Sequence, residues 1–214
     1  MKAGLVVLAV VALAVIVALG WFVSISNDLV AREQAVREAW AQVQNVYQRR
    51  ADLIPNLVET VKGFAAQERA VLEEVTRARA SVAGMQVTPE ILQDPEALRK
   101  FHEAQAQLGG ALGRLLAVVE RYPDLKSNQN FLALQSQLEG TENRIVVERR
   151  RYNEVVREYN TAIRRFPESL VASLRGFPER PYFEATPHER VECGDLAGGQ
   201  DVDEDPTLGQ PAHS

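Results

Sequence analysis

The feature that most constrains this chain is an apolar run near its N-terminus, from Leu5 to Val23. The run contains only Val, Ala, Leu, Ile, Phe, Trp and one Gly, and no side chain from Ala3 to Asn27 is ionisable. A helix of this length spans about 28 Å, which matches the hydrocarbon thickness of a bilayer. Trp21 suits an anchor at the membrane interface. The pattern predicts a transmembrane helix that holds the rest of the chain at a membrane.

A cleaved signal peptide is the alternative interpretation of the same run. Lys2 gives it a basic start, and residues 18–20 resemble a cleavage site. The run is longer than the usual signal core of about 7–15 residues, which favours an uncleaved anchor. Arg32 and Arg37 follow its far end, so the distribution of basic residues favours a cytoplasmic position for the domain that follows.

After the anchor, apolar residues recur three and four positions apart, which is the pattern of helices that pack lengthwise against one another. Arg, Glu and Gln fill most of the other positions. The spacing predicts an all-α fold that begins with one long amphipathic helix. The apolar positions of that helix are Val36, Trp40, Val43, Tyr47, Ile54, Leu57, Val61, Phe64, Val71, Val75 and Val82.

Pro55 lies within this register and cannot donate a hydrogen bond to the carbonyl of Ala51. Either the chain reverses here and forms a helical hairpin, or the helix continues with a kink. The neighbouring residues Leu53, Ile54 and Leu57 are apolar rather than turn formers, and the three-four spacing continues across them. This pattern favours a kinked, continuous helix.

Two breaks divide the rest of the chain. The segment Gly84–Pro89 ends the first helix, and its closing Thr-Pro pair is typical of a helix start. The loop Tyr122–Asn128 separates two further long helices, and Phe166-Pro167 ends the last one. The sequence therefore predicts an antiparallel bundle of three long helices, the first kinked at Pro55. The alternative is a four-helix up-and-down bundle.

The domain boundaries follow from these patterns. Residues 1–4 flank the anchor (5–23), residues 26–183 form the helical bundle domain, and residues 184–214 form a tail. The last part of the bundle domain, residues 168–183, predicts a short helix followed by an extended strap. The tail carries eight acidic residues and one basic residue with few large apolar groups, which predicts an acidic disordered segment.

Polar residues interrupt the apolar line of the last long helix. Glu142 and Arg149 lie seven residues apart on that line. Either they belong to a solvated face, or they form a buried polar layer that fixes the register of the helices. The sequence alone leaves both interpretations open.

Several separated segments resemble the LemA family of bacterial proteins. They are RRADLIPNLVETVKGF at 49–64, LEGTENRI at 138–145, RYNE at 151–154, YNTA at 159–162 and PYF at 181–183. The resemblance covers about residues 5–185. It implies an all-helical bundle anchored in the bacterial cytoplasmic membrane by a single pass. The family has no assigned enzymatic activity, and one branch is associated with magnetosome membranes.

The resemblance also supplies the candidate site residues. It carries over no catalytic, cofactor-binding or metal-binding residue, so we expect structural roles. The family-motif positions are Arg50, Asp52, Pro55, Asn56, Glu59, Thr141, Glu142, Asn143, Arg144, Tyr152, Asn153, Tyr159 and Asn160.

The sequence offers few residues for metal or catalytic chemistry. Its three histidines are His102, His188 and His213, and none belongs to the Glu-x-x-His pairs that a carboxylate-bridged metal site in a bundle needs. Cys193 is the single cysteine. The basic run Arg149–Arg151 is interleaved with glutamates, which indicates ion pairing on an exposed helix face rather than nucleic-acid binding. We expect no metal, no cofactor and no nucleic-acid partner.

Two hypotheses for the function remain. The first is a membrane-anchored scaffold or adaptor without enzymatic activity, which contacts lipid through Leu5–Val23 and holds protein partners or further copies of itself at the membrane. The alternative is an enzyme, or a cofactor-binding or metal-binding bundle, with a polar site around Asp52, Asn56, Glu142 and Arg149. The first is favoured because the sequence contains no recognisable set of catalytic residues.

Overall fold

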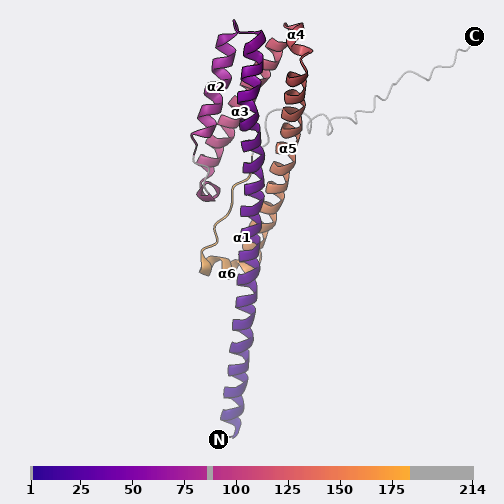
Figure 1. Cartoon of the computed structure of the whole chain (residues 1–214). Helices are drawn as coiled ribbons and strands as arrows, with labels where there is room; N and C mark the ends of the chain where they lie inside the picture. The colour runs from indigo at the N-terminus through magenta and orange to yellow at the C-terminus, as the bar shows by residue number, and fades with distance from the viewer. Residues whose placement is uncertain (1, 86–88, 184–214) are drawn as a thin grey trace, which may run out of the picture. The chain divides into compact units, whose positions relative to one another are not determined.

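The computed structural model describes residues 2–85 and 89–183, while residues 1, 86–88 and 184–214 lie outside the description. The described residues form helices and connecting segments, with no strand among them (Figure 1). The elements are α1 (Lys2–Phe64), α2 (Arg69–Ala83), a 3-10 helix η1 (Pro89–Gln93), α3 (Pro95–Val119), α4 (Pro123–Lys126), α5 (Gln129–Arg164) and α6 (Glu168–Arg175). The all-α prediction is confirmed. The predicted N-cap at Thr88 and the predicted acidic tail fall outside the described residues.

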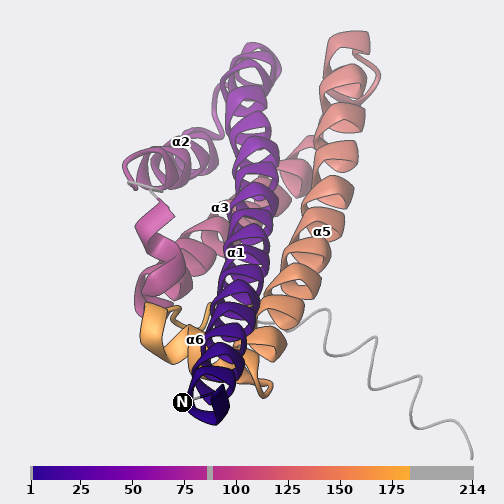
Figure 2. The same ribbon diagram turned by 90° about the horizontal axis from the view of Figure 1, so that it is seen from below.

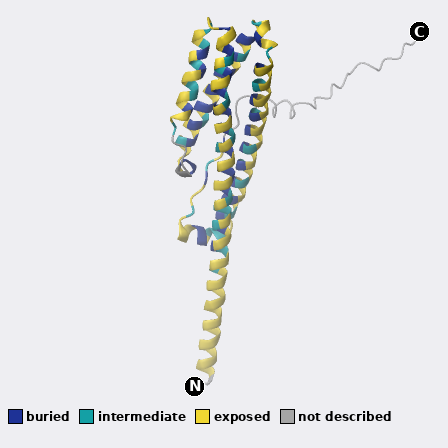
Figure 3. Cartoon of the chain, in the orientation of Figure 1, coloured by how far each residue is buried: buried dark blue, intermediate teal, exposed yellow. Residues whose placement is uncertain are grey.

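The helix α1 carries the apolar run directly into the folded part of the chain. Residues 3–21 are exposed throughout (Figure 3), and the first buried side chains are those of Ser26 and Leu29. The helix is long and apolar enough near its N-terminus to cross a membrane. Because no break separates residue 23 from residue 26, the apolar run and the bundle share one helix.

The same helix passes through Pro55 without reversing. The carbonyl of Ala51, which Pro55 cannot serve, accepts a hydrogen bond from Nε of Arg79 on α2 at 2.9 Å. Pro55 itself is exposed, so its ring faces away from the core. The prediction of a continuous helix is confirmed here and the hairpin at Pro55 is wrong. A kink at Pro55 stays a prediction.

The expected continuation of this helix to Val82 is also wrong. The chain leaves α1 after Phe64 and enters α2 at Arg69, which adds a fourth long helix to the three expected. The residues between the two helices, 65–68, include neither Gly nor Pro. The turn forms without them because its backbone remains hydrogen-bonded: the N–H of Glu68 donates to the carbonyl of Ala65 at 3.0 Å. The apolar spacing simply resumes on the other side, so periodicity gave no sign of the reversal.

Two hydrophobic clusters form the core, and α1 contributes to both. The helix packs against α5 along the bundle and against α2 near its C-terminal end, and α2 packs in turn against α3 (Figures 1 and 2). The cluster nearer the apolar run contains Trp40, Phe101 and Tyr152. The other contains Ile54 and Leu115.

Local signals place the later elements. Asp94 caps α3 by accepting from the N–H groups of Glu96 and Ala97 at 2.9 and 3.2 Å. Asn128 caps α5, since its side chain accepts from the N–H of Phe131 at 3.1 Å. Gly176 ends α6 in the left-handed conformation with φ of 72°. The expected short helix and extended strap follow α5, and the strap comprises residues 177–183.

We expect Arg79 and Pro55 to be energetically coupled. Arg79→Ala leaves the carbonyl of Ala51, a buried residue, without its side-chain donor and lowers the free energy of unfolding by about 1–3 kcal/mol. Pro55→Ala leaves the chain folded and anchored and supplies a backbone N–H for the same carbonyl, so Arg79→Ala costs at least about 0.5 kcal/mol less in that background. Urea unfolding of the four proteins of this double-mutant cycle measures the coupling.

The matched control is Arg77→Ala, because Arg77 is an exposed arginine of the same helix. It changes the free energy of unfolding by less than about 0.5 kcal/mol. Strictly additive costs for Pro55→Ala and Arg79→Ala would contradict the role given to Arg79.

Candidate functional site

Two asparagines of α5 hold the strap by pairing with its backbone. Asn160 accepts from the N–H of Arg180 and donates to its carbonyl, both at 2.9 Å. Asn153 pairs in the same way with Phe183, at 2.8 and 3.0 Å. Each amide thus serves both polar backbone groups of one strap residue, as a neighbouring β-strand would do. The two asparagines lie seven residues apart, which places them on one face of the helix.

Two tyrosines complete the attachment of the strap. The Tyr152 hydroxyl donates to the carbonyl of Pro181 at 3.0 Å, and the Tyr159 hydroxyl donates to the carbonyl of Pro178 at 2.9 Å. Both tyrosine side chains are buried. Burial raises the pKa of the Tyr152 hydroxyl above its usual range, and burial also raises the pKa of the Tyr159 hydroxyl. The hydroxyls therefore remain protonated donors over the physiological pH range.

The end of the strap inserts an aromatic ring into the core. The ring of Phe183 is stacked with that of Trp40 at a centroid distance of 5.7 Å and meets the Tyr152 ring edge-on at 5.2 Å. The guanidinium of Arg149 lies 5.3 Å from the centre of the same Phe183 ring. The strap is therefore part of the hydrophobic core rather than a surface loop.

A buried ion pair connects the strap to α1. The guanidinium of Arg180 donates to Glu33 Oε1 at 2.5 Å, and the two side chains are 4% and 16% exposed. The Arg180 side chain also lies beside the Tyr159 ring, with its guanidinium 6.0 Å from the ring centre. Because backbone and side chain of Arg180 are both engaged, this residue joins the strap to α5 and to α1 at once.

Arg50 joins three helices in the middle of the bundle. Its Nη1 donates to Glu142 Oε1 on α5 at 2.7 Å, and its Nη2 donates to the carbonyl of Gln105 on α3 at 3.2 Å. The Gln105 side-chain oxygen accepts from the same nitrogen. The Tyr47 ring lies 5.2 Å from the guanidinium. Only 4% of the Arg50 side chain is exposed, so removing a partner leaves a buried charge without compensation.

The expected polar positions of α5 do not form one layer. Arg149 is buried against the Phe183 ring, whereas Glu142 pairs with Arg50 and leaves 44% of its side chain exposed. Thr141 is buried, and its hydroxyl donates to the carbonyl of Gln137 within the same helix at 2.7 Å. A wholly solvated face is therefore wrong for Arg149 and Thr141. A role of these residues in fixing helix register stays a prediction.

The other motif residues lie on the surface. They are Asp52, Pro55, Asn56 and Glu59 on α1, and Asn143 and Arg144 on α5, and all six are exposed. The proposed polar site that joined Asp52 and Asn56 to Glu142 and Arg149 is therefore not assembled. The reason is the helical period: Asp52 and Asn56 project from the side of α1 that faces away from the buried Arg50.

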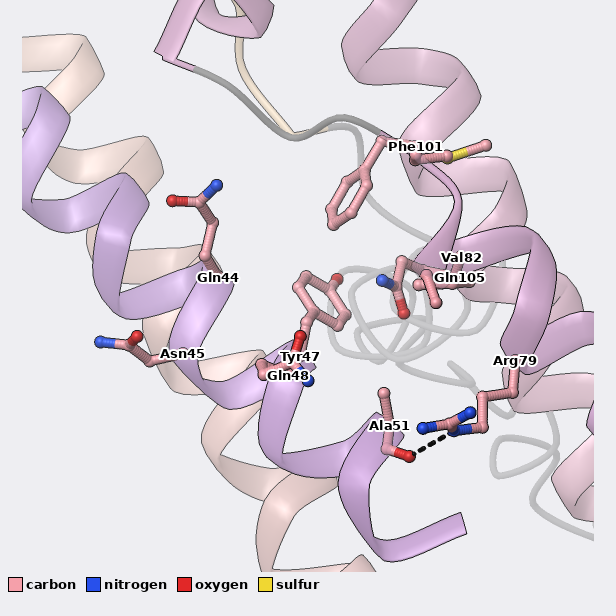
Figure 4. Close-up of a pocket in the computed structure, with 11 residues that line it drawn as sticks. Gln44, Asn45, Tyr47, Gln48, Ala51, Arg79, Val82, Phe101 and Gln105 are labelled. Atoms are coloured by element: carbon pink, nitrogen blue, oxygen red, sulfur yellow. Dashed lines mark hydrogen bonds between the residues drawn. The ribbon is translucent and has the colours of Figure 1, made fainter. Parts of the chain in front are cut away.

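A pocket of about 390 Å³ lies beside the Arg50 contacts, between α1, α2 and α3. Figure 4 shows the side chains of Tyr47, Gln48 and Gln105 at its wall, with Arg79 bonded to the carbonyl of Ala51 at its edge. The lining is rich in side-chain amides. Within residues 2–85 and 89–183, no group of three or more His, Cys, Asp or Glu side chains could hold a metal ion.

Four residues on which these contacts depend were not singled out from the sequence: Arg79, Gln105, Glu33 and Arg180. Gln105 is buried between the apolar positions Phe101 and Leu108, so a polar residue on an apolar line was the available signal. Glu33 and Arg180 offered no local signal, because they are 147 residues apart and each looks like an ordinary charged surface residue.

We expect the asparagine pairs to be required for docking of the strap. Asn160→Ala leaves the N–H and the carbonyl of the buried Arg180 unpaired and lowers the free energy of unfolding by about 1–3 kcal/mol. Asn143→Ala, on the exposed side of the same helix, changes it by less than about 0.5 kcal/mol. Urea unfolding together with amide exchange of residues 177–183 measures both effects. Equal stability of the two variants would contradict the pairing.

We also expect loss of stability in alkaline solution. The folded-state pKa values of Tyr152 and Tyr159 are raised, so the stabilisation from their protonated hydroxyls is complete below the unfolded value near 10 and is lost as pH rises through the folded values. The Tyr152→Phe/Tyr159→Phe variant shows a smaller dependence of stability on pH above about 10. Tyr182→Phe, an exposed position of the same strap, retains the full dependence. Circular dichroism with tyrosinate absorbance makes the measurement.

Comparison of the sequence with known proteins identifies the family of this chain. The model of the LemA family matches residues 39–193. The chain is 27% identical to magnetosome protein MamQ of Magnetospirillum gryphiswaldense over 177 residues, which is 75% of this chain and 65% of the relative. It is 28% identical to magnetosome protein MamQ 2 of Paramagnetospirillum magneticum over 182 residues, covering 78% of this chain and 64% of the relative.

A further relative is protein LemA of Metamycoplasma hominis, which is 23% identical over 171 residues, covering 80% of this chain and 74% of the relative. The chain thus spans slightly less than two thirds of the length of the MamQ relatives. The family match covers more than half of the chain and includes every motif residue named above. The chain belongs to the LemA family.

Proposed function

We propose that this chain is a single-pass scaffold of the bacterial cytoplasmic membrane, which holds partner proteins at a fixed position above the lipid. The observation that carries the proposal is the continuity of α1, which is exposed and apolar at one end and runs through the bundle at the other. The basic residues that follow the apolar run, Arg32 and Arg37, favour a cytoplasmic position for the bundle in this proposal. The proposal assigns the chain no catalytic activity.

Continuity of α1 makes the anchor and the bundle one mechanical unit. A helix of 63 residues is about 95 Å long, and it contains no interruption at which the bundle would swing freely. Asn56 lies about 50 Å along the helix from Val23. A partner bound near Asn56 is therefore held at a defined distance from the membrane.

The exposed motif residues of α1 are the proposed contact surface, which we call the α1 stripe: Asp52, Asn56 and Glu59. Their spacing of four and three residues places them on one face of the helix. Among the described residues, Asp52 is bonded to Gln48 at 2.7 Å and Glu59 to Lys62 at 3.4 Å, both within α1. The stripe thus takes no part in joining the helices, unlike the motif residues Arg50 and Asn160.

The chemistry of the α1 stripe indicates what kind of partner fits. Two carboxylates and an amide accept hydrogen bonds, so a partner surface with arginine or lysine side chains is complementary. The exposed ring of Pro55 adds an apolar contact at the middle of the stripe. Burial of such charged groups at an interface favours specificity and orientation more than raw affinity.

Site-specific photo-crosslinking of the full chain in its membranes tests the proposal. A photoreactive amino acid at Asn56 is expected to give one dominant protein adduct, a partner or a second copy of the chain. The same amino acid at Glu73, an exposed position on α2, is the matched control and is expected to give none. Asp52→Lys/Glu59→Lys, which reverses the charge of the stripe, is expected to remove the adduct at Asn56.

Two outcomes would contradict the proposal. One is an equal adduct pattern from Asn56 and Glu73. The other is a membrane-extracted chain that is monomeric and has no stoichiometric partner. Native mass spectrometry of the same material also addresses the alternative of a ligand-binding bundle, because a retained small molecule would favour occupancy of the amide-lined pocket instead.

A further inference from the structure

The short helix α6 is apolar on the side that faces away from the bundle. Its buried side contributes Val171 and Ala172 to the core. On the other side, Leu170 and Leu174 are 57% and 78% exposed, and Phe166 just before the helix is 76% exposed. A surface helix of a water-soluble domain normally presents polar residues there. Large exposed apolar side chains at regular spacing indicate contact with a further apolar phase.

The position of α6 indicates which apolar phase this is. Glu168, in the first turn of α6, lines one hollow together with Asp28 and Arg32 of α1. The apolar run of α1 ends at Val23, so α6 lies within about two helical turns of the end of that run. Figures 1 and 2 show α6 lying across α1 at the end of the bundle from which the exposed part of α1 projects.

We propose that α6 is an interfacial helix that rests on the same bilayer that the apolar run of α1 spans, with Phe166, Leu170 and Leu174 inserted at the level of the lipid headgroups. Trp21, which is 50% exposed, marks the same level on α1. The inference rests on the proposed membrane anchor, because the anchor brings α6 to the lipid. Two attachments, one spanning and one lying flat, fix the tilt of the bundle and therefore the direction in which the α1 stripe points.

The charged residues around α6 fit a contact that is mainly apolar. The adjacent hollow is lined by three basic residues and three acidic residues: Arg32, Arg157, Arg165, Asp28, Glu158 and Glu168. Because these charges balance, the hollow does not select an anionic headgroup. Arg175 in the last turn of α6 has a long apolar stem, which suits a side chain that lies along a membrane surface with its charge in the water. The proposal therefore extends to zwitterionic lipid.

A protein partner on this face is the competing occupant. Continuity favours lipid, since α6 begins beside Asp28, five residues beyond the apolar run of α1, and that run is exposed from residue 5 to residue 21. A bilayer that surrounds residues 5–23 necessarily ends near residue 23, next to α6. A protein partner would have to compete with that bilayer for the same level.

Spin-label accessibility in lipid distinguishes these occupants. The full chain, carrying Cys193→Ser, is labelled at a single introduced cysteine and reconstituted in phosphatidylcholine vesicles. Three variants are compared: Leu13→Cys in the anchor, Leu174→Cys on α6, and Val147→Cys, an exposed apolar position of α5. Collisions with oxygen, which concentrates in lipid, are compared with collisions with a water-soluble nickel chelate.

We expect the ratio of oxygen to nickel collisions at Leu174 to be raised toward that at Leu13 and to lie well above that at Val147. Leu170→Glu in the Leu174→Cys background is expected to lower the ratio at Leu174, while Val146→Glu, at another exposed position of α5, leaves it unchanged. A ratio at Leu174 equal to that at Val147, with Leu13 in lipid, overturns the interfacial contact and leaves the anchor standing. Protection from both reagents at Leu174 overturns it in favour of a protein contact. Exposure of Leu13 to the nickel chelate overturns the anchor itself.

Discussion

The hydrogen-bonded backbone of α1 is the constraint on which the rest of the fold depends. This helix supplies Trp40 and Tyr47 to one hydrophobic cluster and Ile54 and Leu57 to the other, so both clusters are built on one helix that does not break. Pro55 lies where such a break would occur. The helix tolerates it because the proline ring points to solvent and because Arg79 of the next helix donates to the carbonyl that the proline leaves unserved. The continuity of α1 therefore depends on a contact from α2 as well as on the local sequence of α1.

The same physical rule explains several polar side chains inside the bundle, among them the motif residues Arg50, Asn153 and Asn160. Arg79 serves the carbonyl of Ala51, Arg50 serves the carbonyl of Gln105, and Asn153 and Asn160 serve both backbone groups of a strap residue. Arg50 adds a further donor to a carbonyl within α3, whereas Arg79, Asn153 and Asn160 each substitute for a backbone partner where regular secondary structure supplies none. Replacing such a residue with an apolar one leaves a buried donor or acceptor unpaired, which costs more than the hydrogen bond itself contributes.

The motif residues thus divide into two groups with different consequences. Those that point inward, such as Tyr152 and Asn160, are fully used by the strap and the core. Those that point outward, such as Asp52 and Asn56, do not join helices to one another, and in the proposed scaffold they meet a partner. The exposed apolar side of α6 lies about 45 Å away along α1, close to the proposed membrane surface. In this proposal the two surfaces have different roles. The apolar side of α6 orients the bundle on lipid, and the α1 stripe presents a polar face at a fixed distance from that lipid.

Much of the fold could be read from the sequence because its signals are local. The apolar run from Leu5, the three-four spacing across Pro55, and the loop signals at Tyr122–Asn128 and Phe166-Pro167 each act within a few residues of where they lie in the chain. The reversal after Phe64 could not be read in this way. The turn is made by local backbone hydrogen bonds and needs neither Gly nor Pro. The apolar spacing is the same whether the helix continues or folds back.

The candidate site shows the same division. The sequence by itself determined which residues carry the family motifs, that the chain is helical, and that an apolar helix precedes the bundle. Only the tertiary structure decided which motif residues point inward, that Asn153 and Asn160 pair with a strap 20 to 30 residues away, and that Glu33 meets Arg180 across 147 residues. The reason is physical: helical periodicity fixes which residues share a face, whereas the partner of that face depends on how the chain folds back on itself.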